Sequence, residues 1–331
     1  MKLFMAGDWR TGTGPANVTK YYIDNLPKGT LYQKAVSKPT RLIEIFFNTL
    51  RADTVVYSGY SKQNIIGLKL AKRFGRHSAY IMHGCVEHEN KINLVPDDTM
   101  CRVERQTMAL ADMVIAVSPS FEAWLKQNYP EYSEKITHIT NGIDEHIIEL
   151  CRKSENIVRD PSMILTVGGG MPRKQIKKIC EAVKRINDIQ GKNLKLVVIG
   201  DKGADTEAIN AYPFVDNRGL VTFAQTVELM KTASLFVQNS CFETFGLAPL
   251  EAIACGCPTL MSREVGALCL VKNAGFDDVI NHYDDEIEIA DKIDYLLEHP
   301  NAKNLIEGID ITNNTWSKRC EELIQKLSKI Q

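Results

Sequence analysis

Short apolar runs alternate along the chain with amphipathic stretches, which is the pattern of βα units around a parallel sheet. In the first half, the pattern predicts strands near residues 2–6, 53–57, 78–82, 112–117 and 135–139. Helices are predicted near residues 16–25, 40–50, 62–74, 99–111 and 119–127. The segment from Cys85 to Thr99 has no pattern that we can interpret.

A second series of βα units starts at Met163–Gly168, after the polar stretch Arg152–Pro161. We interpret that stretch as a linker between domains. Further strands are predicted near residues 194–199, 220–224, 234–238 and 257–261. The length of 331 residues suits two domains of about 150 residues each.

The predicted first domain covers residues 1–150 and the second covers residues 151–315. The remaining segment, 316–331, is predicted to form an amphipathic helix with Cys320, Leu323 and Leu327 on one face. Such a helix either stays on the second domain or crosses back to the first.

Composition is that of an ordinary soluble protein, with 44% hydrophobic and 24% charged residues and a formal net charge of −1. This charge gives no global attraction to nucleic acid or membranes, and no nucleic-acid partner is expected. Nine scattered cysteines argue against a disulfide framework and fit a reducing cytoplasm. Cys255 and Cys257 lack the companions of a zinc site and are expected to fill apolar space.

No apolar run reaches the ~18 residues of a membrane-spanning helix, and the short apolar start does not resemble a signal peptide. The expected location is therefore the cytoplasm, where a lipid-linked substrate is reached from the water side.

The stretch Asn239–Ala252 carries the strongest chemical signal. A predicted strand leads into a loop with Glu243, and a helix is predicted to begin around residues 245–247. The N–H groups and positive dipole of a helix start suit a diphosphate. Glu243 and Glu251 can both accept hydrogen bonds from vicinal sugar hydroxyls. The alternative is a pair of solvated acids around a helix start.

Two adjacent cations follow the first strand of the second half, where Gly168–Gly170 leads to Arg173 and Lys174. Cations are unfavourable at a helix N-terminus, so this pair indicates an anionic ligand. A leaving nucleoside diphosphate gains negative charge, which fixed Arg and Lys groups stabilise well. The alternative is a solvated helix start.

Taken in order, these motifs resemble those of glycosyltransferase family 4. Glu243 and Glu251, with seven residues between them, resemble its Glu-x7-Glu signature, and Gly168–Lys174 resembles its glycine, arginine and lysine segment. Three other segments resemble landmarks of the same family: Ile81–Gly84, Ala111–Ser118 and Asn141–Asp144. Together the matches cover most of the chain.

The resemblance implies the α/β architecture called GT-B, in which two Rossmann-like domains face each other across a cleft. It also implies a retaining transfer from a nucleoside diphosphate sugar. Glu243 would contact hydroxyls of the donor sugar, Glu251 the ribose, and Arg173 and Lys174 the diphosphate. His83 would lie near the transferred sugar from the opposite wall. In the second half of the chain, the resemblance also assigns donor binding to Gly169 and to the backbone of Phe245, Gly246 and Leu247.

The first loop, Gly7–Ala16, resembles the family's glycine-rich loop beneath the donor diphosphate. Gly12 and Gly14 permit close approach of the backbone to a ligand. The loop lacks the third glycine of a dinucleotide motif and the ending of a P-loop, so a plain tight turn is the alternative. His83 alone is equally compatible with a structural role.

Lys69, Lys72, Arg73 and Arg76 are spaced to form one cationic helix face. Such a face suits anionic lipid headgroups or a diphosphate-linked carrier, and it also suits plain solvation. Peripheral contact with the inner face of the membrane therefore stays open.

We interpret the chain as a hexosyltransferase that moves a sugar, UDP-linked by family frequency, to a hydroxyl of a glycan, lipid-linked or other acceptor, as in polysaccharide biosynthesis. The alternatives are a GT-B sugar-nucleotide epimerase that needs no acceptor, an inert sugar-nucleotide-binding module and an NAD-dependent dehydrogenase. The dehydrogenase rests only on tandem α/β units and Gly168–Gly170. The sequence has no Asp-x-Asp beside the proposed donor site, so neither a metal nor another cofactor is expected.

Overall fold

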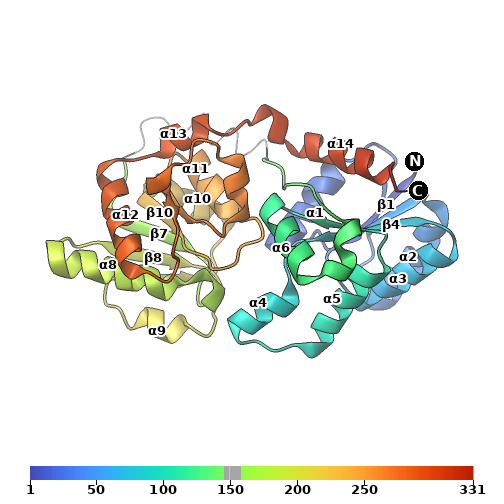
Figure 1. The fold of residues 1–331 in the computed structure, drawn as a ribbon, viewed down its shortest axis with the longest axis horizontal. Coiled ribbons are helices and arrows are strands. Elements are labelled where there is room, and N and C mark those ends of the chain that lie inside the picture. The colour runs from blue at the N-terminus through green and yellow to red at the C-terminus, as the bar shows by residue number, and fades with distance from the viewer. Residues whose placement is uncertain (145–148, 150–157, 331) are drawn as a thin grey trace. The chain divides into compact units, whose positions relative to one another are not determined.

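The computed structural model describes residues 1–144, 149 and 158–330, which form two compact units (Figure 1). Unit 1 comprises Met1–His88, Pro96–Asp144 and Thr312–Gln331, and unit 2 comprises Glu89–Val95 and Glu145–Ile311. The predicted boundary at residue 150 and most of the predicted linker Arg152–Pro161 lie outside the described residues. Asp160 and Pro161 are part of a strand rather than of a linker.

Unit 1 is built on a parallel six-stranded sheet with the order β2-β1-β3-β4-β5-β6. Its strands are β1 (Leu3–Gly7), β2 (Leu31–Tyr32), β3 (Thr54–Ser58), β4 (His77–Met82), β5 (Met113–Ala116) and β6 (Ile136–His138). Its helices include α1 (Gly14–Asn25), α2 (Lys38–Arg51), α3 (Lys62–Arg73), α5 (Asp98–Leu110), α6 (Pro119–Asn128) and α14 (Trp316–Leu327).

Local sequence explains why the helices of unit 1 begin where they do. Thr13, Ser37 and Ser118 each accept a hydrogen bond from a backbone N–H of the first turn, and a proline follows within two residues. A hydroxyl cap satisfies an N–H group that the helix leaves open, and proline fixes a helical φ angle there. The fully buried strands β1 and β3 directly precede α1 and α3, which explains the βα periodicity.

Unit 2 repeats the plan with a parallel six-stranded sheet of order β12-β11-β10-β7-β8-β9. Its strands are β7 (Asp160–Val167), β8 (Lys195–Ile199), β9 (Val215–Gly219), β10 (Ala233–Gln238), β11 (Thr259–Ser262) and β12 (Val279–Ile280). Its helices include α8 (Ile176–Gln190), α9 (Thr206–Asn210), α10 (Phe223–Thr232), α11 (Leu247–Ala254), α12 (Glu286–Glu298) and α13 (Ala302–Glu307).

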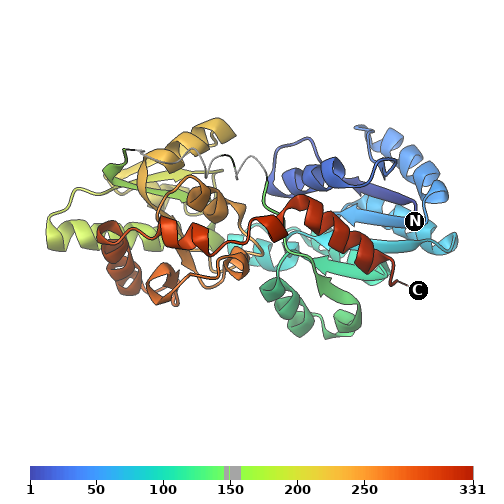
Figure 2. The ribbon, with the colours of Figure 1, turned by 90° about the horizontal axis from the view of Figure 1, so that it is seen from above.

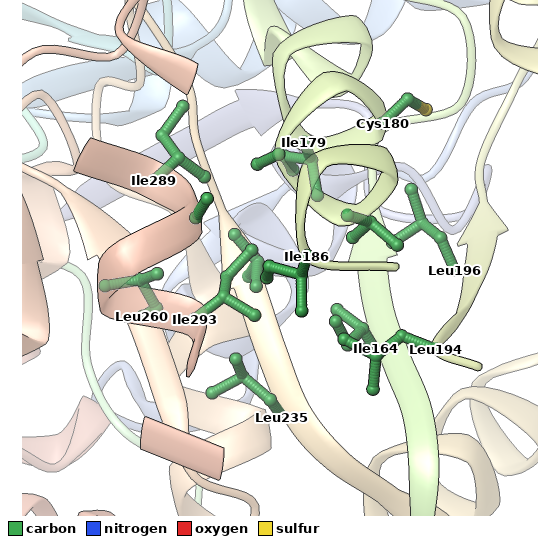
Figure 3. Packing of buried hydrophobic residues seen from close by; sticks show 14 of the residues in the cluster. Ile164, Ile179, Cys180, Ile186, Leu194, Leu196, Leu235, Leu260, Ile289 and Ile293 are labelled. Atoms are coloured by element: carbon green, nitrogen blue, oxygen red, sulfur yellow. The ribbon is translucent and has the colours of Figure 1, made fainter. Parts of the chain in front are cut away.

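Aliphatic side chains fill the space between the sheet of unit 2 and helices α8 and α12 (Figure 3). Ile179 and Ile186 of α8 meet Leu235 of β10 and Ile293 of α12 in one buried cluster. Cys255 and Cys257, with no exposed surface, belong to the cluster on the other side of the sheet. They are apolar fillers, as expected.

The last helix, α14, packs on unit 1. In both views, α14 lies against the rest of unit 1 (Figures 1 and 2). Its Trp316 is 3% exposed and stacks on Tyr21 of α1, with 5.0 Å between ring centroids. Lys326 donates a hydrogen bond of 2.9 Å to the Thr137 hydroxyl of β6. A Cβ atom at Gly142 would lie 2.8 Å from Trp316, so this packing explains the glycine in the Asn141–Asp144 landmark.

Several predicted elements are displaced or missing. The strand expected at residues 220–224 is wrong: β9 lies earlier, at Val215–Gly219, and Thr222 caps α10 together with Gln225. The uninterpreted segment from Cys85 to Thr99 contains α4 (Val86–Asn93), none of whose residues is fully buried. The short strands β2 and β12 were also not predicted.

Candidate active site

Two loops of unit 2 that carry predicted chemistry lie next to each other at one edge of the sheet. Strands β7 and β10 are neighbours, with β8 and β9 beyond β7 and with β11 and β12 beyond β10. The strand order therefore reverses between β7 and β10. Open α/β sheets bind ligands at the carboxyl ends of the strands that flank such a reversal. The loops after these two strands contain residues 168–175 and 239–246.

The loop after β7 is glycine-rich because it packs tightly on another backbone segment. Gly169 has a φ angle of +57°, and a Cβ atom there would lie 1.9 Å from the carbonyl oxygen of Asp201. A Cβ atom at Gly170 would lie 2.0 Å from the hydroxyl of Thr206. Packing within unit 2 thus accounts for the glycine at position 169. Its predicted contact with a donor stays a prediction.

The loop after β7 then turns Arg173 and Lys174 toward the loop after β10. Both side chains approach one oxygen of Glu243: Lys174 Nζ pairs with Oε2, and Arg173 Nη1 lies 3.4 Å from the same atom. The exposed fractions of the three side chains are 17% for Arg173, 12% for Lys174 and 10% for Glu243. The alternative of a solvated helix start is therefore wrong for these cations.

Charge pairing decides the protonation state of Glu243. Burial alone would raise the pKa of this carboxyl, but Lys174 and Arg173 outweigh it and hold the pKa below its ordinary value. Glu243 is therefore ionised at neutral pH. Glu89 of α4 also belongs to this cluster, because its Oε2 lies 3.6 Å from Arg173 Nε, so two cations are balanced by two carboxylates.

Hydrogen bonds fix the loop that carries Glu243. The Ser240 carbonyl accepts a hydrogen bond of 2.6 Å from the Ser262 hydroxyl, and the amide of Asn239 donates to Tyr283 over 2.8 Å. Backbone N–H of Gly266 donates to the carbonyl of Glu243 over 3.0 Å. A loop held at several points presents its charges without having to reorganise when a ligand arrives.

Helix α11 begins directly after this loop. Gly246, with a φ angle of +86°, is its N-cap and gives no side-chain cap, so the first-turn N–H groups keep their donor capacity. Phe245 is 2% exposed, and so its ring belongs to the core while its backbone lies at the helix start. Leu247 is the first helical residue, as predicted, and Glu251 is partly exposed on the same helix.

In unit 1, the loop after β1 holds the two predicted donor-contacting glycines. Gly12 has a φ angle of +74°, a left-handed conformation that favours glycine. Gly14 begins α1, and a Cβ atom there would meet no heavy atom within 4 Å. Packing therefore does not explain why glycine stands at position 12 or at position 14. At position 14 the backbone conformation does not require glycine either. The loop also contains Asp8, which accepts a hydrogen bond from the Arg10 N–H over 3.0 Å.

His83 directly follows β4 at the carboxyl edge of the sheet of unit 1. Its ring is hydrogen-bonded to a hydroxyl group that is in turn bonded to a second hydroxyl group. Its Nε2 lies 2.8 Å from Ser58 Oγ, which lies 2.7 Å from Thr19 Oγ1. Thr19 donates its one proton to the carbonyl of Pro15 over 2.9 Å. Ser58 must then donate to Thr19, and His83 must donate its Nε2 proton to Ser58.

The hydrogen bonds thus assign the Nε2–H tautomer to His83, in which Nδ1 is the acceptor. Burial lowers the pKa of His83 from its ordinary value of 6.5 to about 4, so the ring is neutral at physiological pH. A neutral imidazole that is held by Ser58 can orient a hydroxyl but carries no charge to offer a phosphate. Sequence reasoning missed Ser58 and Thr19, because only the pairing of β1, β3 and β4 brings them to His83.

The residues that the structure describes contain neither a metal-binding cluster nor a membrane-spanning helix. No group of three or more His, Cys, Asp or Glu side chains in that part of the chain is arranged to hold a metal ion. Within the same residues, no helix combines the length and apolar character needed to cross a membrane.

Each half of the chain matches the model of a glycosyltransferase family. Residues 148–311 match the model described as glycosyl transferases group 1, and residues 4–146 match the model described as glycosyltransferase family 4. The chain is 24% identical to a D-inositol 3-phosphate glycosyltransferase of Stackebrandtia nassauensis over 350 residues, covering 93% of this chain and 76% of that protein.

Solved structures show the same fold. HepE of Anabaena, crystallised with UDP and glucose, has a TM-score of 0.72 at 15% identity, with 99% of each chain covered. A sucrose-phosphate synthase from Thermosynechococcus elongatus has a TM-score of 0.71 at 18% identity, with 100% of this chain and 99% of that one covered. These neighbours have the GT-B architecture predicted from the motifs.

Proposed function

Because this chain is a glycosyltransferase with the GT-B fold, we propose that it transfers a hexose from a UDP-linked donor to a hydroxyl group of a glycan or lipid-linked acceptor, with retention of the anomeric configuration. The observation that carries the proposal is the buried cluster of Arg173, Lys174 and Glu243 beside the start of α11. UDP is favoured because HepE, which shares the fold, was crystallised with UDP and with UDP-glucose.

In the proposed reaction, the cluster compensates the charge of the leaving diphosphate. As the bond between the anomeric carbon and the phosphate oxygen breaks, negative charge grows on the diphosphate. Arg173, Lys174 and the N–H groups at residues 245–247 would stabilise that charge in a site with little water. The leaving phosphate oxygen takes the proton of the acceptor hydroxyl as the new bond forms on the same face of the sugar.

The other predicted residues would position the donor. Glu243 would accept a hydrogen bond from a sugar hydroxyl, and Glu251 would accept hydrogen bonds from the ribose. The absence of a Cβ atom at Gly12 and Gly14 would let the backbone approach the diphosphate. His83 Nδ1 would accept a hydrogen bond from a hydroxyl of the transferred sugar.

Ligand-induced thermal stabilisation tests the donor class. A ligand that binds only the folded state stabilises it by ~2.7 kcal/mol at one hundred times its dissociation constant, so UDP is expected to raise the melting temperature. NAD is expected to leave it unchanged. A rise with NAD and none with UDP or GDP would contradict the proposal.

Incubation with UDP-sugars then separates a transferase from an epimerase. A transferase is expected to release UDP slowly from its donor by transfer to water, while an epimerase converts the sugar and leaves it attached to UDP. Mass spectrometry and NMR of the products distinguish the two outcomes. An epimerised donor without UDP release would overturn the proposed reaction.

The neutral state of His83 gives a pH prediction. Because the folded pKa of about 4 lies below the ordinary 6.5, folding favours the uncharged ring. The contribution to stability is complete above pH ~6.5 and is lost as pH falls from there toward 4. NMR titration is expected to show no protonation of His83 between pH 5.5 and 8. A midpoint near 6.5 would show that burial does not hold the ring neutral.

A further inference from the structure

Helix α2 of unit 1 carries large apolar side chains on its outer side. Ile43 is 58% exposed, Phe46 39% and Phe47 50%, whereas Ile45 and Thr49 on the inner side are fully buried. The rings of Phe46 and Phe47 lie 5.5 Å apart, and Phe46 also contacts Phe74 at 6.3 Å. Three neighbouring exposed apolar groups on one helix are costly in water, and they indicate a surface that is covered in some functional state.

The same part of the chain is strongly cationic. Residues 38–76, which contain α2 and α3, have eight Lys and Arg against two Asp and Glu, a local charge of +6 in a chain of net charge −1. Both acids are already engaged by backbone N–H groups: Glu44 by Ala35 at 2.8 Å, and Asp53 by Lys2 at 2.6 Å. The carboxylates of Glu44 and Asp53 therefore already accept hydrogen bonds within unit 1.

The cations of this segment stay available for an external anion. Among the described residues, the following six form no ion pair with an acid: Lys38, Arg51, Lys62, Lys69, Lys72 and Arg73. On α3, Lys62, Ile66, Lys69 and Arg73 recur at spacings of three or four residues and share one helix face. Ile66 on that face is 46% exposed.

The two helices pack on each other in unit 1, and Figure 1 shows α2 and α3 side by side. The contact between Phe46 and Phe74 ties the outer side of α2 to the end of α3. The exposed apolar stripe and the cationic face are therefore adjacent. We call this combined region, built on Ile43, Phe46, Phe47, Lys69, Lys72 and Arg73, the α2–α3 surface.

We propose that the α2–α3 surface docks the protein on an anionic lipid bilayer. A helix that lies at a bilayer surface places Phe and Leu-like side chains among the acyl chains and Lys and Arg among the headgroups, and this surface offers both. Each cation near an anionic membrane strengthens binding by about fivefold. A polyanion such as RNA would use the cations, but it would leave the aliphatic Ile43 and Ile66 exposed to water.

Lipid docking is independent of the proposed donor chemistry, because no residue of the α2–α3 surface belongs to the donor site. It would bring the enzyme to acceptors that are themselves held in a membrane. The lipid experiment therefore needs no substrate, and its failure leaves the transferase proposal untouched.

Co-sedimentation of the full chain with vesicles tests the proposal. We expect binding to vesicles of two parts phosphatidylcholine and one part phosphatidylglycerol, and little binding to pure phosphatidylcholine. Two variants are informative: Phe46→Ser/Phe47→Ser removes the apolar stripe, and Lys69→Gln/Lys72→Gln/Arg73→Gln removes three charges. The charge variant is expected to bind about a hundredfold more weakly at low salt, since three fivefold factors multiply. The Phe variant is expected to lose the binding that persists in high salt.

Matched controls separate this surface from general charge and folding. Lys20→Gln/Lys28→Gln/Lys303→Gln removes three exposed lysines elsewhere, and Phe223→Ser removes a 49% exposed phenylalanine of α10. Both controls are expected to bind vesicles as the wild type does. Cooperative thermal unfolding, followed by circular dichroism, is expected in all variants, which shows that they are folded.

Three results would overturn the proposal. The first is no binding to anionic vesicles at low salt, and the second is equal losses in the test and control variants. The third is retention on heparin without any binding to vesicles, which would indicate a soluble polyanion as the partner instead.

Discussion

The double substitution Arg173→Ala/Lys174→Ala is expected to lower kcat by about two powers of ten or more, and to weaken donor binding as well. Both cations face the position where we place the leaving diphosphate, and their stabilising effect grows as its charge develops. We further propose that these cations take the place of a divalent metal. Turnover of the wild type is therefore expected to be the same in EDTA and in added Mn²⁺.

Two controls separate electrostatic catalysis from structural damage. Lys177→Ala/Lys178→Ala removes two cations a few residues further along, where the side chains are 46% and 29% exposed, and activity is expected to persist. Adding Glu243→Gln to the double variant removes the buried charge that the first two changes leave unpaired. Stability should then recover while kcat stays low. The opposite result is activity that EDTA abolishes and Mn²⁺ restores, together with an unimpaired double variant. That result would show that a metal, and not Arg173 and Lys174, compensates the charge of the leaving diphosphate.

Replacement of either glutamate of the Glu-x7-Glu motif is expected to reduce kcat/KM by about tenfold or more. Each variant, Glu243→Ala or Glu251→Ala, loses a charged hydrogen bond to the donor, worth ~1.5–3 kcal/mol. The two variants should differ in stability. Glu243→Ala leaves Lys174 buried without its counter-ion, which costs about 3–5 kcal/mol, while Arg173 keeps Glu89 and Glu251 is partly exposed.

Kinetics of the glutamate variants must be measured well below the melting temperature of Glu243→Ala, so that loss of folded enzyme does not mimic loss of catalysis. The matched control is Glu228→Ala on α10, whose side chain is 73% exposed and which should behave as wild type. Unchanged kcat/KM in both motif variants would remove the two carboxylates from the donor site.

Periodicity located the buried elements well because their apolar residues are continuous. Strands β1, β3, β4, β8 and β10 lie within one or two residues of the predicted positions. Prediction failed at β9, whose sequence Val-Asp-Asn-Arg-Gly is polar because the strand is at the edge of the sheet and half exposed. Of the apolar residues just beyond it, Leu220 and Val221 precede α10 and Phe223 begins it; the Thr222 and Gln225 capping box is the signal for that helix start.

At the candidate site, the sequence predicts which residues meet a donor but not which residues they contact in the fold. Arg173 and Lys174 were assigned to a diphosphate, and the structure pairs both with Glu243, about 70 positions away in the chain. That pairing depends on β7 and β10 being neighbours, which a single sequence does not show. The Thr19–Ser58–His83 chain depends in the same way on the pairing of β1, β3 and β4.

The return of α14 to unit 1 has a consequence for biosynthesis. A ribosome releases residues 1–144 long before Trp316, yet the partners of Trp316 are Tyr21, Tyr22 and the turn at Gly142. Until α14 emerges, a nascent unit 1 exposes the aromatic surface that this helix later covers. Unit 2, whose residues 158–311 are translated in between, can complete its own sheet first. The half of the protein that is synthesised first would then be the last to reach its final packing.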